Sequence, residues 1–245
     1  MIKILFDFII SFIGLLFLAP IILPIIVLVW AQDKKSPFYI APRSGMNSRV
    51  FNMIKLRSMV IDANKSGVDS TAENDSRITP VGHFIRKYKL DEFTQLWNVL
   101  IGDMSLVGPR PNVNSETNLY TNEEKRLLSV KPGITDFSSI VFSDESEILK
   151  DKEDPNLSYN QLIRPWKSRL GLIYIDNRSI LLDLKIIFYT VIAIISKQTS
   201  LDWVSEQVHN LNADPDLVDI SKRKVDLYPF PPPGSDKVVL SRKIS

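Results

Sequence analysis

Cysteine is absent from this chain of 245 residues, so disulfide bonds and thiolate chemistry are excluded. Only two histidines occur, His83 and His209, and their separation does not match the spacing of a zinc site. The 30 basic and 28 acidic residues leave a formal net charge of +2. A charge so nearly balanced does not indicate a nucleic-acid-binding protein, and no internal repeat is visible. These absences direct attention to local patterns rather than to overall composition.

Charge is also missing locally, because no Asp, Glu, Lys or Arg occurs between Phe8 and Ala31. A straight helix over this stretch would be about 36 Å long, enough to cross a bilayer. The stretch therefore predicts membrane contact, as a cleaved signal peptide, a spanning helix or a helix that returns to the side it entered. The residues that follow it, Trp30-Ala31-Gln32-Asp33, do not resemble a cleavage site, which disfavours the first alternative.

Two prolines lie inside this apolar run. Pro20 and Pro24 each remove a backbone donor and favour a bend. Lys3 precedes the run and Lys34 and Lys35 follow it, so the positive-inside rule gives no reason to place either end outside. The residues alone leave the spanning and re-entrant alternatives open.

Two segments after the apolar run have recognisable local patterns. The extended residues from Ser36 to Val60, with a turn around Gly45, predict a β-hairpin. The polar stretch from Ile61 to Asp75 predicts a loop, which is either a solvated linker or a lid.

Helical patterns begin at Thr79-Pro80, where threonine suits the cap and proline the first helical position. This amphipathic helix would face either an anionic membrane surface or solvent with its basic side. A second helix is expected from Asp91 to Leu100 and ends at Gly102. Gln95 and Asn98 would share one polar face of it with Asp91.

The C-terminal third contains one long apolar stretch, residues 179–197, which fits either a buried helix or a membrane-surface helix. Farther along, residues 201–211 predict a short helix, and the proline-rich residues 228–234 predict an extended tail. Docking of this tail to a partner is a hypothesis. Arg164, Lys167 and Arg169 surround Trp166, and this basic cluster is interpreted as membrane-facing, nucleotide-facing or simply solvated.

The residues with most chemical potential are Asp91 and Glu92. Paired carboxylates can hold a divalent cation, and one carboxylate oxygen can attack phosphorus. Arg110 lies between Pro109 and Pro111, which would hold an anion-binding guanidinium in fixed geometry. An Asp-Glu pair alone also fits a favourable interaction with the helix dipole. The combination nevertheless points to phosphoryl chemistry.

Several blocks occur in a fixed order along the chain: Lys55-Leu56-Arg57-Ser58-Met59, Arg77-Ile78-Thr79, Leu90-Asp91-Glu92, Gln95-Leu96-Trp97-Asn98-Val99, Gly102-Asp103-Met104-Ser105, Gly108-Pro109-Arg110-Pro111, Lys131-Pro132-Gly133-Ile134-Thr135 and Ser179-Ile180-Leu181-Leu182-Asp183-Leu184-Lys185. Together they resemble the monotopic bacterial sugar transferases, the small phosphoglycosyl transferases that use polyprenyl phosphate. The resemblance extends from about residue 1 to about residue 197.

The resemblance implies an α+β, mostly helical fold. It comprises an N-terminal re-entrant membrane helix in residues 1–33, and a short β-hairpin and amphipathic interfacial helices around a compact catalytic domain in residues 34–200. Beyond the resemblance, the change in composition after Gln198 predicts a C-terminal extension with a proline-rich tail in residues 201–245. The re-entrant hinge would lie at Ala19-Pro20, where many relatives have serine before the proline. The implied location is the cytoplasmic face of the bacterial inner membrane, with the lipid bilayer as a partner, no nucleic acid, and homo-oligomerisation left open.

The implied activity is transfer of a phosphosugar from a UDP-sugar to undecaprenyl phosphate, with release of UMP, as the first step of glycan assembly. Asp91 would attack the sugar-bearing phosphorus and form a covalent intermediate, and Mg²⁺ would be held by Glu92 and Asp91. A catalytically silent membrane scaffold and an enzyme acting on a bare phosphoryl group are the competing hypotheses.

Four basic residues are candidate phosphate ligands by the same resemblance. Arg86 and Arg110 would bind phosphate or brace the carboxylates, and Lys55 and Arg57 are further candidates. After Thr135, many relatives continue with Gly-Trp and an arginine-containing segment, whereas this chain has residues 136–145 without a clear equivalent of that arginine. The sugar is therefore not predicted.

Overall fold

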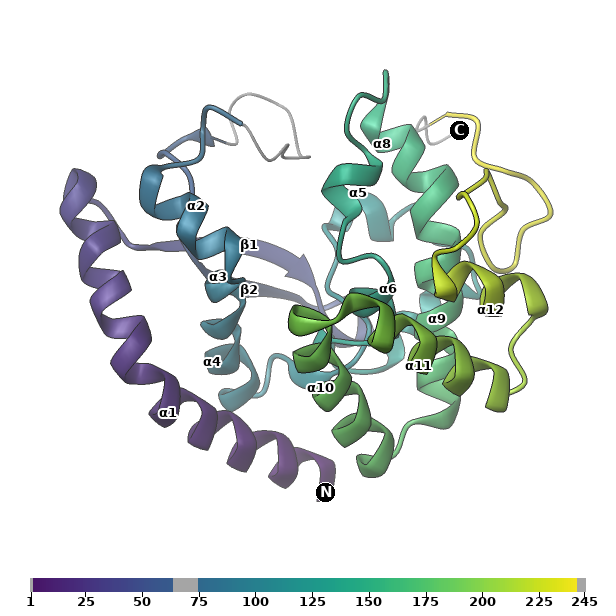
Figure 1. Cartoon of the computed structure of the whole chain (residues 1–245), viewed down its shortest axis with the longest axis horizontal. Helices are drawn as coiled ribbons and strands as arrows, with labels where there is room; N and C mark the ends of the chain where they lie inside the picture. Colours follow the sequence, from purple (N-terminus) through teal and green to yellow (C-terminus); the bar gives the residue numbers. More distant parts are fainter. Residues whose placement is uncertain (1, 64–74, 242–245) are drawn as a thin grey trace. The chain divides into compact units, whose positions relative to one another are not determined.

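The computed structural model describes residues 2–63 and 75–241 of the chain (Figure 1). The described residues are mostly helical, with two small two-stranded sheets, which confirms the α+β, mostly helical class. The chain divides into two compact units: Met1–Arg43 with Val50–Leu106, and Ser44–Arg49 with Val107–Ser245. Most of the loop expected from Ile61 to Asp75 lies outside the described residues. The expected boundaries after residues 33 and 200 stay predictions.

The first unit begins with the long helix α1 (Ile2–Asp33), which contains both Pro20 and Pro24. The helix is continuous through the expected hinge at Ala19-Pro20, and its ribbon changes direction along its length (Figure 1). Within the part of the chain that is described, α1 alone is long and apolar enough to cross a membrane. One face, which includes Ile22, Ile25 and Val29, is buried, whereas most of the other large apolar side chains of α1 are exposed.

The expected hairpin is confirmed by β1 (Phe38–Ser44) and β2 (Val50–Leu56), which form a two-stranded sheet. A short 3₁₀ turn, η1 (Met46–Ser48), connects the strands. Such a short connection requires the strands to run antiparallel.

Three short helices complete the first unit. The expected cap is confirmed at α2 (Pro80–Lys87), where the Thr79 hydroxyl accepts a hydrogen bond from the Gly82 amide at 3.0 Å. The single helix expected from Asp91 to Leu100 is wrong, because α3 (Leu90–Phe93) and α4 (Gln95–Leu100) are separated at Thr94. The Thr94 hydroxyl donates to the Asp91 carbonyl at 3.0 Å and to the Ile54 carbonyl in β2 at 3.1 Å. Hydrogen bonds from a threonine side chain to nearby carbonyls compete with the regular helical pattern, which explains the interruption. Buried side chains from α1, β2, α2 and α3 form one core: Ile25, Val29, Leu56, Ile85 and Leu90.

The second unit is entered through β3 (Ser105–Val107), which pairs with β4 (Gly133–Thr135). The remaining elements, in order, are α5 (Asn114–Thr117), η3 (Glu124–Ser129), α6 (Phe137–Val141), α7 (Glu145–Ile148), α8 (Pro155–Ser158), η4 (Tyr159–Ile163), α9 (Arg164–Asn177), α10 (Ile180–Ile195), α11 (Lys197–Asn210) and α12 (Pro215–Lys222). The short helix expected from residue 201 is confirmed within α11.

Helix α10 has two unlike faces. Leu182, Asp183 and Ile186 are buried, and the Asp183 carboxylate accepts a hydrogen bond from the Tyr174 hydroxyl at 2.7 Å. The opposite face exposes Leu181, Leu184, Phe188, Val191, Ile194 and Ile195. The apolar stretch is therefore neither fully buried nor polar on its outer side.

The C-terminal tail folds back on its own unit. Phe230 stacks on Trp166 of α9 with ring centroids 4.3 Å apart, and the Phe230 amide donates to the Gln161 carbonyl at 3.1 Å. Arg169 donates to the Pro231 carbonyl at 2.9 Å. Figure 1 shows the tail in yellow beside α9 and α12. The tail is thus held by contacts within its own unit, and its docking to a partner stays a hypothesis.

Candidate active site

Asp91 lies in the first turn of α3, directly after a sharp change of chain direction. Lys89 has a left-handed backbone (φ 52°, ψ 31°), which costs about 1–2 kcal/mol for a residue with a β-carbon. The Lys89 amide donates to the Arg86 carbonyl at 3.1 Å, which fixes the turn between α2 and α3. Strained residues of this kind concentrate at functional sites, where packing holds them in place.

The Asp91 side chain lines a cavity of about 430 Å³ within the first unit. This volume lies in the range of about 300–1,000 Å³ that small-molecule sites occupy. Basic side chains line the same cavity: Arg43, Lys55, Arg57 and Arg86. The cavity therefore combines one carboxylate of the expected pair with three of the four expected phosphate ligands, and Arg43 was not foreseen.

Lys55 makes a loose contact with the carboxylate. The Lys55 ammonium lies 3.4 Å from the Asp91 carboxylate, and the two side chains are 22% and 18% exposed. At this length and exposure the pair leaves both charges available to a ligand, because partly hydrated ion pairs contribute little net stability. The contact places the Lys55 ammonium beside the carboxylate, where it could neutralise the negative charge of a bound anionic group.

Arg86 enters the cavity from α2 and is held by Ser58, whose hydroxyl accepts a hydrogen bond from the Arg86 Nε at 3.0 Å. Burial lowers the pKa of Arg86, while Asp91 and Asp75 act in the opposite direction. Its guanidinium nevertheless stays charged, because arginine is not deprotonated in proteins. Ser58 belongs to the Lys55–Met59 block of the sequence, and this block is the sequence feature from which the contact with Arg86 could have been predicted.

Arg57 has a different role in the structure. Its guanidinium donates to both oxygens of Asp33 at 2.6 and 2.7 Å, and its Nε donates to the Ser36 carbonyl at 2.8 Å. This pairing joins the end of α1 to β2. A phosphate would have to compete with Asp33, so the assignment of Arg57 to phosphate stays a prediction.

Glu92 follows Asp91 in α3, and adjacent helical side chains point in different directions. Among the described residues no cluster of three or more acidic or histidine side chains could hold a metal ion. Mg²⁺ commonly binds through one or two carboxylates, with water and substrate phosphates completing its shell. Asp91 lines the cavity and could serve as such a ligand, whereas Glu92 is not among the lining residues, so coordination of one ion by both carboxylates stays a prediction.

The polar face expected on the helix after Asp91 is mainly structural. Asn98 is fully buried, where its oxygen accepts from the Ile54 amide at 3.0 Å and its nitrogen donates to the Asn52 carbonyl at 2.8 Å. It therefore clamps β2, the strand that carries Lys55. Gln95 is also buried, and its side-chain nitrogen has no hydrogen-bond partner among the described residues.

Arg110, the fourth expected phosphate ligand, belongs to the second unit. Its guanidinium donates to the Ile134 carbonyl at 3.2 Å. Its turn crosses β4 closely: the Gly108 amide donates to the Thr135 carbonyl, and the Gly133 amide donates to the Pro109 carbonyl, both at 3.0 Å. A β-carbon on Gly133 would lie 2.1 Å from the Gly108 nitrogen. The Gly108–Pro111 and Lys131–Thr135 blocks therefore each need their glycine, because their backbones pass too closely here to leave room for a β-carbon.

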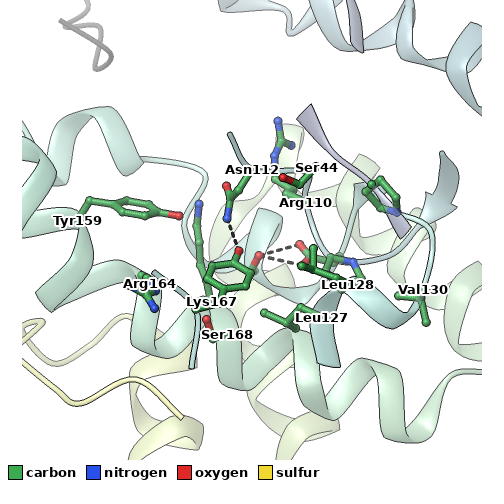
Figure 2. Close-up of a pocket in the computed structure, with 16 residues that line it drawn as sticks. Ser44, Arg110, Asn112, Leu127, Leu128, Val130, Tyr159, Arg164, Lys167 and Ser168 are labelled. Atoms are coloured by element: carbon green, nitrogen blue, oxygen red, sulfur yellow. Dashed lines mark hydrogen bonds between the residues drawn. The ribbon is translucent and has the colours of Figure 1, made fainter. Parts of the chain in front are cut away.

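Arg110 also lines a small polar pocket of about 40 Å³ (Figure 2). Asn112 donates to the Tyr120 hydroxyl there at 2.6 Å, and burial raises the pKa of Tyr120 above its usual range. The volume is enough for about one water molecule rather than a nucleotide.

The basic cluster around Trp166 is mostly internal. Arg164 is buried and forms a two-point ion pair with Glu124, which also accepts a hydrogen bond from Ser168 at 2.8 Å. Lys167 pairs with Glu145, and Arg169 lies over the ring of Phe230. The interpretation as a membrane-facing, nucleotide-facing or solvated face is therefore wrong for Arg164.

Known proteins resemble most of the chain. A family model described as "Bacterial sugar transferase" matches residues 1–197. A "UDP-glucose:undecaprenyl-phosphate glucose-1-phosphate transferase" from Klebsiella pneumoniae is 36% identical over 189 residues, which are 76% of this chain and 38% of that protein. "Galactosyl transferase CpsE" from Streptococcus agalactiae is 40% identical over 156 residues, or 59% of this chain and 33% of that protein.

A shorter relative is covered more completely. "Exopolysaccharide production protein ExoY" from Sinorhizobium fredii is 32% identical over 204 residues, which are 77% of this chain and 83% of that protein. The chain thus spans well under half the length of the Klebsiella and Streptococcus relatives and most of the length of the Sinorhizobium protein.

Proposed function

This chain belongs to the bacterial sugar transferase family, and we propose that it is a membrane-bound phosphoglycosyl transferase. It would move a phosphosugar from a UDP-sugar to undecaprenyl phosphate and release UMP, as the first step of bacterial glycan assembly. The observation that carries this proposal is the Asp91 carboxylate, which lines a cavity of ligand size together with four basic side chains. The relative named as a UDP-glucose:undecaprenyl-phosphate transferase supports the two substrate classes.

In the first step of the proposed reaction, a carboxylate oxygen of Asp91 forms a bond to the sugar-bearing phosphorus. The bond from that phosphorus to the oxygen bridging the two phosphates breaks, and its electron pair leaves with UMP. Lys55 lies close enough to Asp91 to neutralise charge on the phosphoryl oxygens during attack. The product is a phosphosugar held on Asp91 as an acyl phosphate.

In the second step a phosphate oxygen of undecaprenyl phosphate attacks the same phosphorus. The Asp91–phosphorus bond breaks and the carboxylate is regenerated, which leaves a lipid-linked diphosphate sugar. Arg86, braced by Ser58, is positioned to hold one of the phosphates. Arg110, in the second unit, stays a candidate for the same task.

We also propose Mg²⁺ as the cofactor, with Glu92 and Asp91 as its protein ligands. When bound, the ion would neutralise the diphosphate of the donor and favour departure of UMP. Replacement of Glu92 by Gln should then raise the Mg²⁺ concentration needed for half-maximal activity, and an unchanged requirement would remove Glu92 from the proposed site.

Membrane attachment through α1 is supported by its exposed apolar side chains and by Trp30, whose ring lies 4.1 Å from the Lys34 ammonium. Both ends of α1 are tied to the first unit. Asp7 accepts from the Ser105 hydroxyl at 2.8 Å, and Asp33 pairs with Arg57. Ends that are tied to one folded unit favour the re-entrant arrangement, with the protein on the cytoplasmic face of the inner membrane.

The exposed apolar faces of α2 and α10 support the same attachment. Phe84 and Tyr88 are each about half exposed at α2, beside Lys87. A row of exposed apolar side chains with adjacent lysines suits the boundary between lipid headgroups and acyl chains. These helices would lie at the membrane surface.

The competing hypothesis is a silent scaffold that retains the fold without activity. UMP release from a panel of UDP-sugars, measured in detergent with undecaprenyl phosphate and Mg²⁺, separates the two. The transferase predicts release with at least one donor, loss of that release in Asp91→Asn, and retention in Asp219→Asn, a matched change at an exposed carboxylate in α12. Release that survives in Asp91→Asn would overturn the assigned nucleophile, and no release from any donor would favour the scaffold.

A further inference from the structure

The cavity around Asp91 has an apolar rim that the proposed phosphoryl chemistry does not use. We use the word rim for four apolar residues that line the cavity: Phe38 and Ile40 of β1, and Val60 and Ile61, which follow β2. They are 37%, 57%, 47% and 42% exposed. Exposed apolar side chains that line one charged cavity indicate a binding surface rather than random exposure.

The rim is joined to the end of the membrane helix. α1 ends at Asp33, and Phe38 follows after a short connection. The Arg57 amide donates to the Pro37 carbonyl at 2.8 Å, and the Arg57 side chain holds Asp33 and the Ser36 carbonyl. These contacts hold the beginning of β1 against the strand that supplies Lys55. The segment between the end of α1 and β1, which leads into Phe38, is therefore fixed beside the strand that supplies Lys55.

The charged residues that line the cavity limit what can bind there. Four basic residues and two carboxylates, Asp62 and Asp91, line this cavity, and the excess of positive charge favours an occupant with an anionic group. The exposed side chains of Phe38, Ile40, Val60 and Ile61 require that its adjacent part be apolar. A polyprenyl phosphate has this sequence of groups, a phosphate followed directly by isoprene units, whereas a UDP-sugar is polar on both sides of its diphosphate.

We infer that Phe38, Ile40, Val60 and Ile61 form the acceptor subsite, which binds the isoprene units next to the phosphate of the lipid acceptor. This inference rests on the proposed function. The subsite would guide the lipid phosphate from the bilayer to the phosphosugar on Asp91, and it would contribute to the second step of the reaction but not to the first.

The test uses the full-length protein with Ile40→Ser, Ile61→Ser and the double variant. Both positions are exposed, so the substitutions should leave the fold intact. Val50→Ser is the matched control, because Val50 is 49% exposed and lies at the end of β2 opposite Lys55. The measurements are the KM for undecaprenyl phosphate, the KM for the UDP-sugar, and flotation with vesicles of phosphatidylethanolamine and phosphatidylglycerol.

We expect each single variant to raise the KM for undecaprenyl phosphate about fivefold, and the double variant more, with the KM for the UDP-sugar, the flotation and the control unchanged. An unchanged KM for the lipid would overturn the subsite. A rise only in the KM for the UDP-sugar would assign the rim to the nucleotide, and a matching loss of flotation would assign it to bilayer attachment. If the wild-type protein transfers nothing to lipid, the proposed function itself fails, and this outcome is distinct from the other three.

Discussion

The cavity around Asp91 and the buried cluster around Arg164 contain the same kinds of side chain but pair them differently. In the first unit Lys55 approaches Asp91 at one point, at 3.4 Å, with both side chains about one-fifth exposed. In the second unit Arg164 and Glu124 are 3% and 0% exposed and form a two-point pair. Glu124 also accepts a hydrogen bond from Ser168, and Arg164 donates one to Asn160.

This difference in pairing distinguishes a candidate ligand-binding site, around Asp91, from a structural ion pair, Arg164 with Glu124. A buried pair whose hydrogen bonds are all made has no capacity left for a ligand, and removal of one partner exposes the other to an unfavourable apolar environment. A partly hydrated carboxylate near one cation can still bind and react. The sequence shows arginines and carboxylates in both regions, and only the completeness of pairing distinguishes them.

Asp91→Asn should produce the largest effect on this comparison. Phosphosugar transfer should fall on the order of 10⁴-fold or more, because a carboxamide cannot serve as the nucleophile. The urea-unfolding free energy should change by less than about 1 kcal/mol, since the Lys55 contact is loose and partly exposed. Steady-state kinetics and urea denaturation of the same preparation measure both. A large loss of stability would make Asp91 a structural residue like Glu124.

Glu124→Gln should destabilise the protein by about 3–5 kcal/mol, because it leaves the Arg164 charge buried and unpaired. Urea denaturation followed by circular dichroism measures the loss. Glu123→Gln is the adjacent control: Glu123 is 42% exposed in its pair with Arg126, so the same change should cost less than about 1 kcal/mol. Equal effects at the two positions would remove the distinction between the regions.

Gly133→Ala should cost about 1–3 kcal/mol or more, because the new β-carbon would meet the Gly108 backbone at 2.1 Å and the crossing must open. Gly14→Ala is the sterically easier comparison, since its β-carbon would approach the flexible end of the Leu96 side chain at 3.2 Å. Thermal unfolding distinguishes the two. If Gly133→Ala were the milder change, the support for Arg110 would not depend on this crossing.

The smallest effect is expected at Asp75. Its hydrogen bonds with Arg77 lower the pKa of Asp75 from 3.8 to about 2. The resulting stability is present above pH 4 and is lost as the pH falls through about 4 to 2. Solvent screening should limit it to about 1 kcal/mol. The difference in unfolding free energy between the wild-type protein and Asp75→Asn should therefore shrink from pH 6 to pH 3, and a difference that grows on acidification would contradict this sign.

Local features were predictable from the sequence. The Thr79 cap with Pro80, the β-hairpin and the end of the helical segment at Gly102 depend on neighbouring residues, and the structure confirms them. The division between α3 and α4 was missed because it depends on Thr94 contacting a strand 40 residues earlier in the chain. Sequence spacing does not record such a contact.

The candidate site was predictable in part. Asp91, Lys55 and Arg86 line one cavity as expected, whereas the pairing of Arg57 with Asp33 could not be read from the Lys55–Met59 block. Arg43 and the rim residues were missed because the spacing of residues along the chain does not show which exposed side chains line a common cavity.

The sequence by itself determined the uncharged run from Phe8 to Ala31 within the N-terminal helix, the order of the family blocks and the acidic pair at the start of α3, because composition and short-range geometry specify them. Only the tertiary structure decided which basic residues are neutralised and which face a cavity. The physical reason is that an ion pair depends on the distance and burial of two groups, and those are set by packing among segments such as α1 and β2 or η3 and α9, which lie far apart in the chain.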